Sequence, residues 1–136
     1  MHKLLATLLC LSATGLACAA DLSVQISDIK TAEGRVMVAV YGNAADFLKA
    51  PLQAVTAAAD PAGKTVVLRD LPPGEYALAV YHDANGNGKM DKNMMGIPTE
   101  DYAFSNNAIG KFGPPAFDSA RITLAAAGST TKISLK

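Results

Sequence analysis

Residues 75–82 read EYALAVYH, and this stretch decides the fold class. Its larger side chains, Tyr76, Leu78 and Val80, alternate with alanines, which places them together on one face of an extended chain. The sequence just before it, DLPPG at residues 70–74, is typical of a turn, because proline fixes φ and glycine tolerates positive φ. The pattern therefore predicts a half-buried β-strand that leaves a tight turn.

The same period of two recurs along the chain, with turn residues between the runs. Only residues 44–48 suggest a helical turn, which Asn43 would cap. Many short strands predict an all-β fold, an antiparallel immunoglobulin-like or prealbumin-like sandwich of about seven strands; a small barrel would produce the same periodicity. The side chains expected to face the core include Val24, Val38, Val80 and Leu124. The predicted strands are residues 22–26, 36–41, 54–58, 64–69, 75–82, 120–125 and 132–136.

Residues 83–119 form one long stretch without sustained periodicity. Long irregular segments in a compact domain are usually functional or disordered. This one holds half of the eight aromatic residues of the chain, a composition that argues against disorder. We expect an ordered loop whose rings are mostly buried as a satellite core beneath residues 113–115. The four rings are Tyr102, Phe104, Phe112 and Phe117.

The first nineteen residues are typical of a secretory signal peptide. A short basic start is followed by an apolar run at residues 4–16, which is too short to span a bilayer, and then by small residues. We expect cleavage after Ala19 or Ala20, a single β-sandwich domain at residues 20–136, no transmembrane segment, and a periplasmic or secreted location. A lipid anchor at Cys18 is not expected, because Gly15 stands where a lipid-attachment motif usually has a large aliphatic residue.

Charge and cysteine content exclude several classes of function. Loss of Lys3 with the signal peptide leaves eleven basic against twelve acidic residues, a net charge of −1 with His82 neutral. No basic stripe is present, so a nucleic-acid partner is not expected. Both cysteines lie within or beside the signal peptide, which excludes a thiol nucleophile and a cysteine-based zinc site in a chain cut after Ala19.

The strongest local motif is DANGNGKMD at residues 83–91, which places oxygen-bearing side chains at every second residue before a glycine. This is the spacing of a calcium-binding loop, in which hard oxygen ligands surround the ion and a glycine makes the sharp turn at position six. Calcium is the cofactor that such a loop would hold. The candidate ligands are Asp83, Asn85, Asn87, the carbonyl of Lys89, and Asp91.

The motif lacks the bidentate glutamate at position twelve, where this chain has Met94. Asn93, Glu100 and Asp101 are the nearest substitutes in sequence. A site with few carboxylates would be weak, in the range of about 10⁻⁴ to 10⁻³ M that suits extracellular modules. The alternative is a metal-free turn, because Asn-Gly sequences are also common hairpin chemistry.

His82 raises two further hypotheses. It could serve as a general base for a nucleophile such as Ser105, although nothing in the spacing links the two residues. Together with the methionines at positions 90, 94 and 95 it could also form a copper site, although methionine equally fills gaps under loops. A structural role for His82 is the simpler expectation.

Three stretches carry a family resemblance: residues 81–98, residues 102–107 (YAFSNN) and residues 112–117 (FGPPAF). They resemble the bacterial exported family catalogued as domain of unknown function 2141, over essentially the whole chain from Leu22 to Lys136. The resemblance implies an exported bacterial protein and supplies no activity. A second likeness, through residues 71–76 and the Asp/Asn-rich loop, is to prealbumin-like and B-type repeat modules, whose loops often bind calcium.

Two classes of function follow. The first is an exported, non-enzymatic module of unknown biological role, stabilised by calcium, that binds a protein, a glycan or a small molecule. The second is a periplasmic hydrolase or other enzyme that uses His82 and the loop carboxylates. The position of His82 discriminates them, because an enzyme needs it in a concave site beside a nucleophile or a pair of carboxylates.

Overall fold

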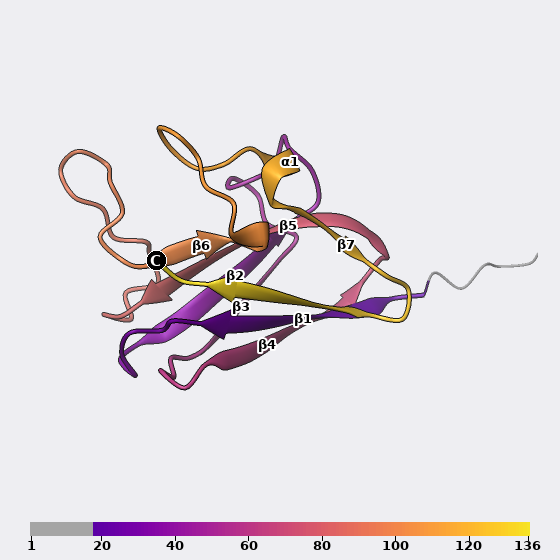
Figure 1. Ribbon diagram of the computed structural model, residues 1–136, viewed down its shortest axis with the longest axis horizontal. Coiled ribbons are helices and arrows are strands. Elements are labelled where there is room, and N and C mark those ends of the chain that lie inside the picture. The colour runs from indigo at the N-terminus through magenta and orange to yellow at the C-terminus, as the bar shows by residue number, and fades with distance from the viewer. Residues whose placement is uncertain (1–17) are drawn as a thin grey trace, which may run out of the picture.

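The computed structural model describes residues 18–136, which form two β-sheets packed face to face (Figure 1). Seven of the eight strands are those predicted from the sequence, with the last one beginning and ending earlier than expected. The signal peptide falls largely outside the described residues. The elements are β1 (Ala20–Ser27), β2 (Arg35–Tyr41), β3 (Gln53–Ala58), β4 (Lys64–Leu71), β5 (Gly74–Asp83), β6 (Tyr102–Phe104), the 3-10 turn η1 (Ser105–Asn107), the single helical turn α1 (Phe117–Ala120), β7 (Arg121–Leu124) and β8 (Ser129–Ser134).

One sheet has the order β4-β1-β8, and the other has the order β3-β2-β5-β6, with β7 also paired to β5. The core lies between them. Val24, Val38, Val80 and Leu124, the four side chains predicted to face inward, are all buried there, which confirms the β-sandwich. Each comes from an alternating strand, so its neighbours in sequence face outward.

One strand pair departs from the antiparallel arrangement of all the others. β1 and β8 run parallel, with Leu22 opposite Ser129 and Ser27 opposite Ser134. A parallel neighbour needs a long connection, and here almost the whole chain separates the two strands. At the end of this pair the backbones of Tyr102 and Lys136 exchange two hydrogen bonds, which link the two sheets at that corner.

The predicted long loop contains a strand that the sequence pattern did not reveal. β6 and β7 follow one another along the same edge of β5, with Phe104 opposite Ala79 and Arg121 opposite Ala77. They are two parts of one edge strand, interrupted by residues 105–120. A strand of three residues is too short to show a periodicity.

Ser105 closes the gap between these two parts. Its hydroxyl accepts a hydrogen bond from the Leu78 N–H at 2.9 Å and donates one to the Ala120 carbonyl. The next residue, Asn106, adopts a positive φ of 61° and donates from its amide to the Arg121 carbonyl at 2.8 Å. Ser105 is fully buried, so these contacts replace the ladder hydrogen bonds that the interruption removes.

Two smaller expectations have mixed outcomes. Residues 44–49 form turns and no helix, although Asn43 accepts a hydrogen bond from the Asp46 N–H at 2.9 Å, as a cap would. Among residues 18–136, no helix is both long enough and apolar enough to cross a membrane. Cys18, the residue that a lipid anchor would use, lies exposed just ahead of β1.

Candidate functional site

Residues 83–91, which we call the acidic loop, begin at the buried end of β5. His82 Nε2 lies 2.6 Å from the carbonyl oxygen of Glu33, so the ring donates its proton to the turn between β1 and β2. Gly34 in that turn approaches so closely that an added Cβ would lie 2.0 Å from the Asp83 carbonyl oxygen. His82 and Asp83 are therefore fixed by backbone contacts from a neighbouring turn.

Asp83 organises the loop from inside. One of its carboxylate oxygens accepts the Asn87 N–H at 3.2 Å, and the other accepts the Gly88 N–H at 2.7 Å. Gly88 has a φ of +76°, which explains why glycine follows the run of asparagines. The sequence motif thus forms the compact turn that its spacing predicts.

The two asparagines face Asp91. The amide nitrogen of Asn87 lies 2.7 Å from one oxygen of the Asp91 carboxylate, and that of Asn85 donates to the other oxygen. These hydrogen bonds hold the pKa of Asp91 below its usual value, because they stabilise the charged form. The Asn85 amide oxygen accepts a hydrogen bond from the Asn87 N–H, and the Asn87 amide oxygen accepts one from the Lys89 N–H.

Glu100 is the one of the three proposed substitutes that the structure brings to this loop. Its carboxylate accepts the Asp91 N–H at 3.2 Å. Partial burial raises the pKa of Glu100, and the negative charges of Asp91 and Asp83 raise it further. The other two substitutes have different partners: Asp101 pairs with Lys30 at 2.7 Å, and Asn93 caps the backbone of the turn that follows it.

Tyr81 reports the same concentration of negative charge. Its pKa is raised first by burial and then by Asp83, Glu100 and Asp91. Within residues 18–136, no three acidic, histidine or cysteine side chains converge closely enough to hold a metal ion by themselves. A cation here would need amide and carbonyl oxygens as well, which requires the amides of Asn85 and Asn87 to turn their oxygens inward. This rotation would break the hydrogen bonds that the amide oxygens accept from the Asn87 and Lys89 N–H groups, so the backbone of the loop would have to rearrange as well.

A groove lies beside this loop, on the outer face of the five-stranded sheet. The register aligns Ala39 on β2 with Ala79 on β5 and then with Phe104 on β6. The neighbouring outward row carries Tyr81 and Tyr102. Ala39 and Ala79 have small side chains, and the rings of Tyr41 and Tyr81 flank them two residues away along β2 and β5, which leaves a channel across the strands.

Residues of three loops border this channel, and together they line a partly open space of about 420 Å³. Leu48 comes from the connection between β2 and β3, and Lys92 from the segment after the acidic loop. Gly113 and Pro114 come from the segment between η1 and α1. We call this space the sheet groove; its lining also includes Ala39, Tyr41, Ala79, Tyr81, Met90, Pro98, Tyr102 and Phe104.

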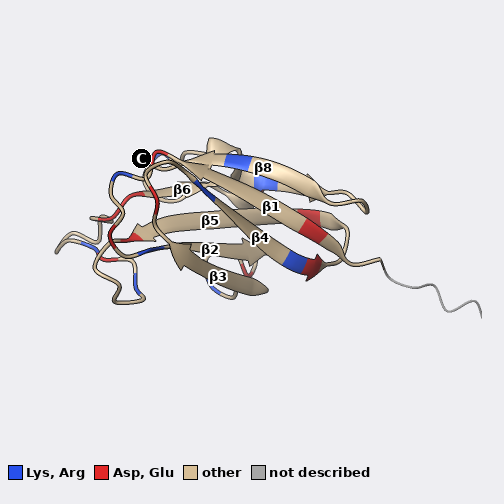
Figure 2. Ribbon diagram, turned by 90° about the horizontal axis from the view of Figure 1, so that it is seen from below, with Lys and Arg blue, Asp and Glu red and all other residues tan. Residues whose placement is uncertain are grey.

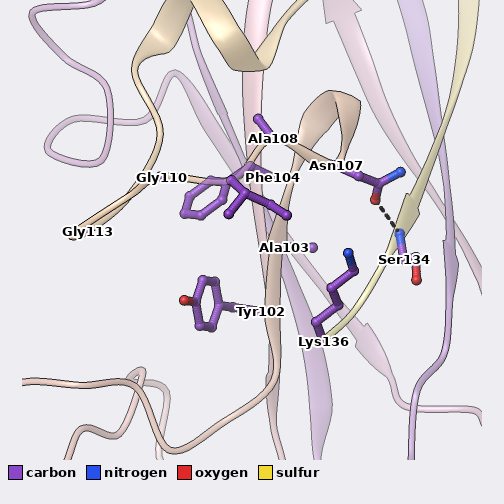
Figure 3. A pocket seen from close by; sticks show the side chains of 10 residues that line it. Tyr102, Ala103, Phe104, Asn107, Ala108, Gly110, Gly113, Ser134 and Lys136 are labelled. Atoms are coloured by element: carbon purple, nitrogen blue, oxygen red, sulfur yellow. Dashed lines mark hydrogen bonds between the residues drawn. The ribbon is translucent and has the colours of Figure 1, made fainter.

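A second hollow of about 330 Å³ lies on the other side of the β6 edge, and Figure 3 shows it from close by. Tyr102 and Phe104 line both spaces. The hydrogen bond from the Ser134 N–H to the Asn107 side chain, 3.0 Å long, closes one side of it.

The sequence matches the family described as uncharacterized protein conserved in bacteria (DUF2141) over residues 24–133. The chain belongs to this family. The matched region runs from β1 to β8 and includes both the acidic loop and the sheet groove. Comparisons with curated proteins and with solved structures gave no match.

In this DUF2141 chain the structure does not assemble the catalytic pair that the sequence allowed. The His82 ring donates to the Glu33 carbonyl, whereas the Ser105 hydroxyl is bonded to Leu78 and Ala120. The structure also does not assemble the copper site, since His82 is buried while Met94 and Met95 are exposed at a loop tip. The two hypotheses need side chains that the fold keeps apart.

The loop aromatics of the DUF2141 chain are partly where they were expected. Phe104 is buried and Phe117 half-buried, and both pack edge-on against Phe47 in a second cluster on the outer face of the five-stranded sheet. Phe112 is fully exposed, so its predicted burial is wrong. The reason is the tight turn at Gly110, where a Cβ would lie 1.9 Å from the Gly113 carbonyl oxygen and where Phe112 forms the tip.

Sequence reasoning missed the sheet groove, although one signal was present. A strand that is solvated on one face carries polar residues there. The outward positions of β2 and β5 instead carry Met37, Ala39, Tyr41, Ala77, Ala79 and Tyr81. Apolar residues on both faces of two central strands indicate that something covers the outer face as well.

Proposed function

We propose that this chain is an exported, non-enzymatic binding module whose sheet groove takes a small ligand with a flat apolar part and an anionic group. The sheet groove itself carries this proposal. Its volume of about 420 Å³ lies within the roughly 300–1,000 Å³ typical of ligand pockets. Aromatic walls suit a flat apolar moiety, and the ammonium of Lys92 suits an anionic group.

Calcium has a supporting part in this proposal. An ion held by Asp83, Asn85, Asn87, the Lys89 carbonyl and Asp91, with Glu100 as the added ligand, would offset two of the three negative charges of Asp83, Asp91 and Glu100. Met90 and Lys92 line the sheet groove on either side of Asp91 in sequence. Ordering the acidic loop would therefore stabilise one wall of the sheet groove.

The position of the first strand favours cleavage after Ala19 in the proposed exported chain. Ala20 is buried and pairs with Leu71 at the start of β1. Cleavage after Ala19 leaves this residue in the sheet, whereas cleavage after Ala20 removes it. The proposed mature chain therefore begins at Ala20, in the periplasm or outside the cell.

The geometry supports the hydrolase alternative less well. A general base needs a free ring nitrogen within reach of the proton it removes. His82 is buried and donates from Nε2 to a backbone carbonyl, and the candidate nucleophile Ser105 is buried with its hydroxyl bonded to two backbone groups.

Binding of anilinonaphthalene sulfonate tests the proposal, because this probe is flat, apolar and anionic. We expect its fluorescence to rise on binding to the parent protein and its affinity to fall at least about tenfold in Ala79→Leu, whose added side chain fills the floor of the sheet groove. Ala58→Leu is the matched control, since Ala58 is exposed on the same sheet but does not line the sheet groove. Equal affinities in Ala79→Leu and the parent, with both proteins folded, would contradict the proposal.

A further inference from the structure

Two loops of the chain expose large apolar side chains at their tips. The first tip, residues 92–98, carries Met94, Met95 and Ile97. The second tip, residues 108–115, carries Ile109 and Phe112. Met94 and Phe112 are fully exposed. In Figure 1 both loops project beyond the sheets on the side away from β1 and β4.

The charges at these tips have one sign. Residues 92–98 contain Lys92 and no acidic residue, and residues 108–115 contain Lys111 and no acidic residue. The carboxylates of Asp91 and Glu100 lie at the base of the first loop, before and after its tip. Apolar side chains accompanied by lysine suit the boundary between lipid headgroups and acyl chains, where the stem of a lysine is buried and its ammonium stays at the headgroups.

Four N–H groups of the first tip, those of Asn93, Met95, Gly96 and Ile97, are hydrogen-bonded within the tip. The side-chain oxygen of Asn93 accepts the N–H groups of Met95 at 2.9 Å and Ile97 at 3.0 Å. The Asn93 N–H donates to the Ile97 carbonyl at 2.9 Å, and the Gly96 N–H donates to the Asn93 carbonyl at 3.0 Å. Internal pairing of these groups lowers the cost of moving the tip into the lipid interface, because fewer of them lose a water partner.

The second tip has fewer backbone N–H groups than a segment of its length usually carries. Pro114 and Pro115 have no N–H groups to leave unpaired. The close approach of Gly110 to the Gly113 carbonyl, which admits no side chain, holds Lys111 and Phe112 at the point of the turn.

From these observations we propose that the two tips insert together into the interface of a membrane that contains anionic lipid. This binding goes beyond the ligand site of the sheet groove and does not depend on it. A second protein surface fits the tips less well, because a stable protein interface takes about 20–30 residues from each partner. The tips offer five large apolar side chains on two separate projections.

Co-sedimentation with vesicles tests this inference, in buffer with a chelator so that calcium cannot bridge carboxylates to lipid. We expect binding to vesicles of phosphatidylglycerol and phosphatidylcholine in equal parts, and weaker binding to phosphatidylcholine alone. The variant Met94→Ser/Phe112→Ser should lower the partition coefficient at least about tenfold. Lys92→Gln and Lys111→Gln should each lower it about fivefold on the anionic vesicles and little on the neutral ones.

Leu52→Ser is the matched control, because Leu52 is an exposed apolar residue, 58% accessible, outside both tips. It should bind vesicles as the parent does. Failure of the parent to bind either vesicle at low salt would overturn the inference, as would equal binding by Met94→Ser/Phe112→Ser. A parent that forms dimers in solution, while that double variant stays monomeric and neither binds lipid, would assign the tips to a second copy of the chain instead.

Discussion

At the level of single residues, the side chains with unexpected positions are mostly held by backbone groups. Ser105 and His82 both carry potentially reactive atoms, and both form hydrogen bonds with backbone groups of neighbouring segments. The sequence could not reveal these roles, because each depends on a partner far away in the chain. The run Ser-Asn-Asn at residues 105–107 was the only local signal, since asparagine tolerates positive φ.

Ser105→Ala should destabilise the fold by about 1–3 kcal/mol, because it leaves the buried Leu78 N–H and Ala120 carbonyl without their partner. Urea unfolding measures the change in the free energy of unfolding. Ser119→Ala is the control, since Ser119 is exposed in the neighbouring helical turn, and it should change stability by less than about 0.5 kcal/mol. A loss of the same size in both variants would show that the hydroxyl of Ser105 does not bridge the interrupted strand.

At the level of elements, the strands were predictable and their partners were not. Alternation in residues 22–26, 36–41 and 75–82 identified which side chains face the core, because period two requires only local information. The parallel pairing of β1 with β8 and the division of one edge strand into β6 and β7 depend on contacts between distant segments. No local pattern records such contacts.

In the acidic loop, too, the local turn could be predicted from the sequence, whereas the contacts with distant residues could not. Its turn, with Asp83 accepting the Asn87 and Gly88 N–H groups, follows directly from the spacing of residues 83–91. Glu100 was only one of three candidates for the missing ligand, and the fold selects it because β6 returns the chain alongside β5. Asp101, one residue later, faces Lys30 instead.

Glu100→Gln should have opposite effects with and without calcium. In the presence of a chelator it should raise the melting temperature, because burial and, after it, the charges of Asp91 and Asp83 raise the pKa of Glu100, so the fold disfavours its charged form. The glutamine oxygen can still accept the Asp91 N–H. With millimolar calcium the parent should gain stability, about 2.7 kcal/mol when the ion is a hundredfold above its dissociation constant, and the variant should gain less.

Asp101→Asn provides the control for this experiment. It also removes one negative charge, but from the ion pair with Lys30, so its response to calcium should equal that of the parent. A parent whose melting temperature does not change between chelator and millimolar calcium would show that residues 83–91 are a metal-free turn.

At the level of the whole molecule, the two faces of the five-stranded sheet differ: one forms the core and the other carries the sheet groove. The inner face packs against β4, β1 and β8 and supplies the core, in which Leu78 and Val80 are buried. The outer face carries the second aromatic cluster and, beside it, the sheet groove. Figure 2 shows that charged residues on the strands are few, and most lie in the loops and at strand ends.

This arrangement explains why the site was harder to predict than the fold. The side chains that line the sheet groove come from three strands and three loops, and most of them are ordinary apolar or aromatic residues. Only the register that sets Ala39 beside Ala79 turns them into a channel. The acidic motif was visible in the sequence because its residues are contiguous.

The most direct test of the central claim is to locate the bound probe by amide chemical shifts of isotope-labelled protein during titration with anilinonaphthalene sulfonate. We predict that the largest changes fall on Ala39, Ala79, Tyr81, Lys92 and Phe104, which line the sheet groove, and not on Leu52 or Ala58. Changes centred on the exposed tips at Met94 and Phe112, with Ala39 and Ala79 unaffected, would contradict the claim that the sheet groove is the binding site.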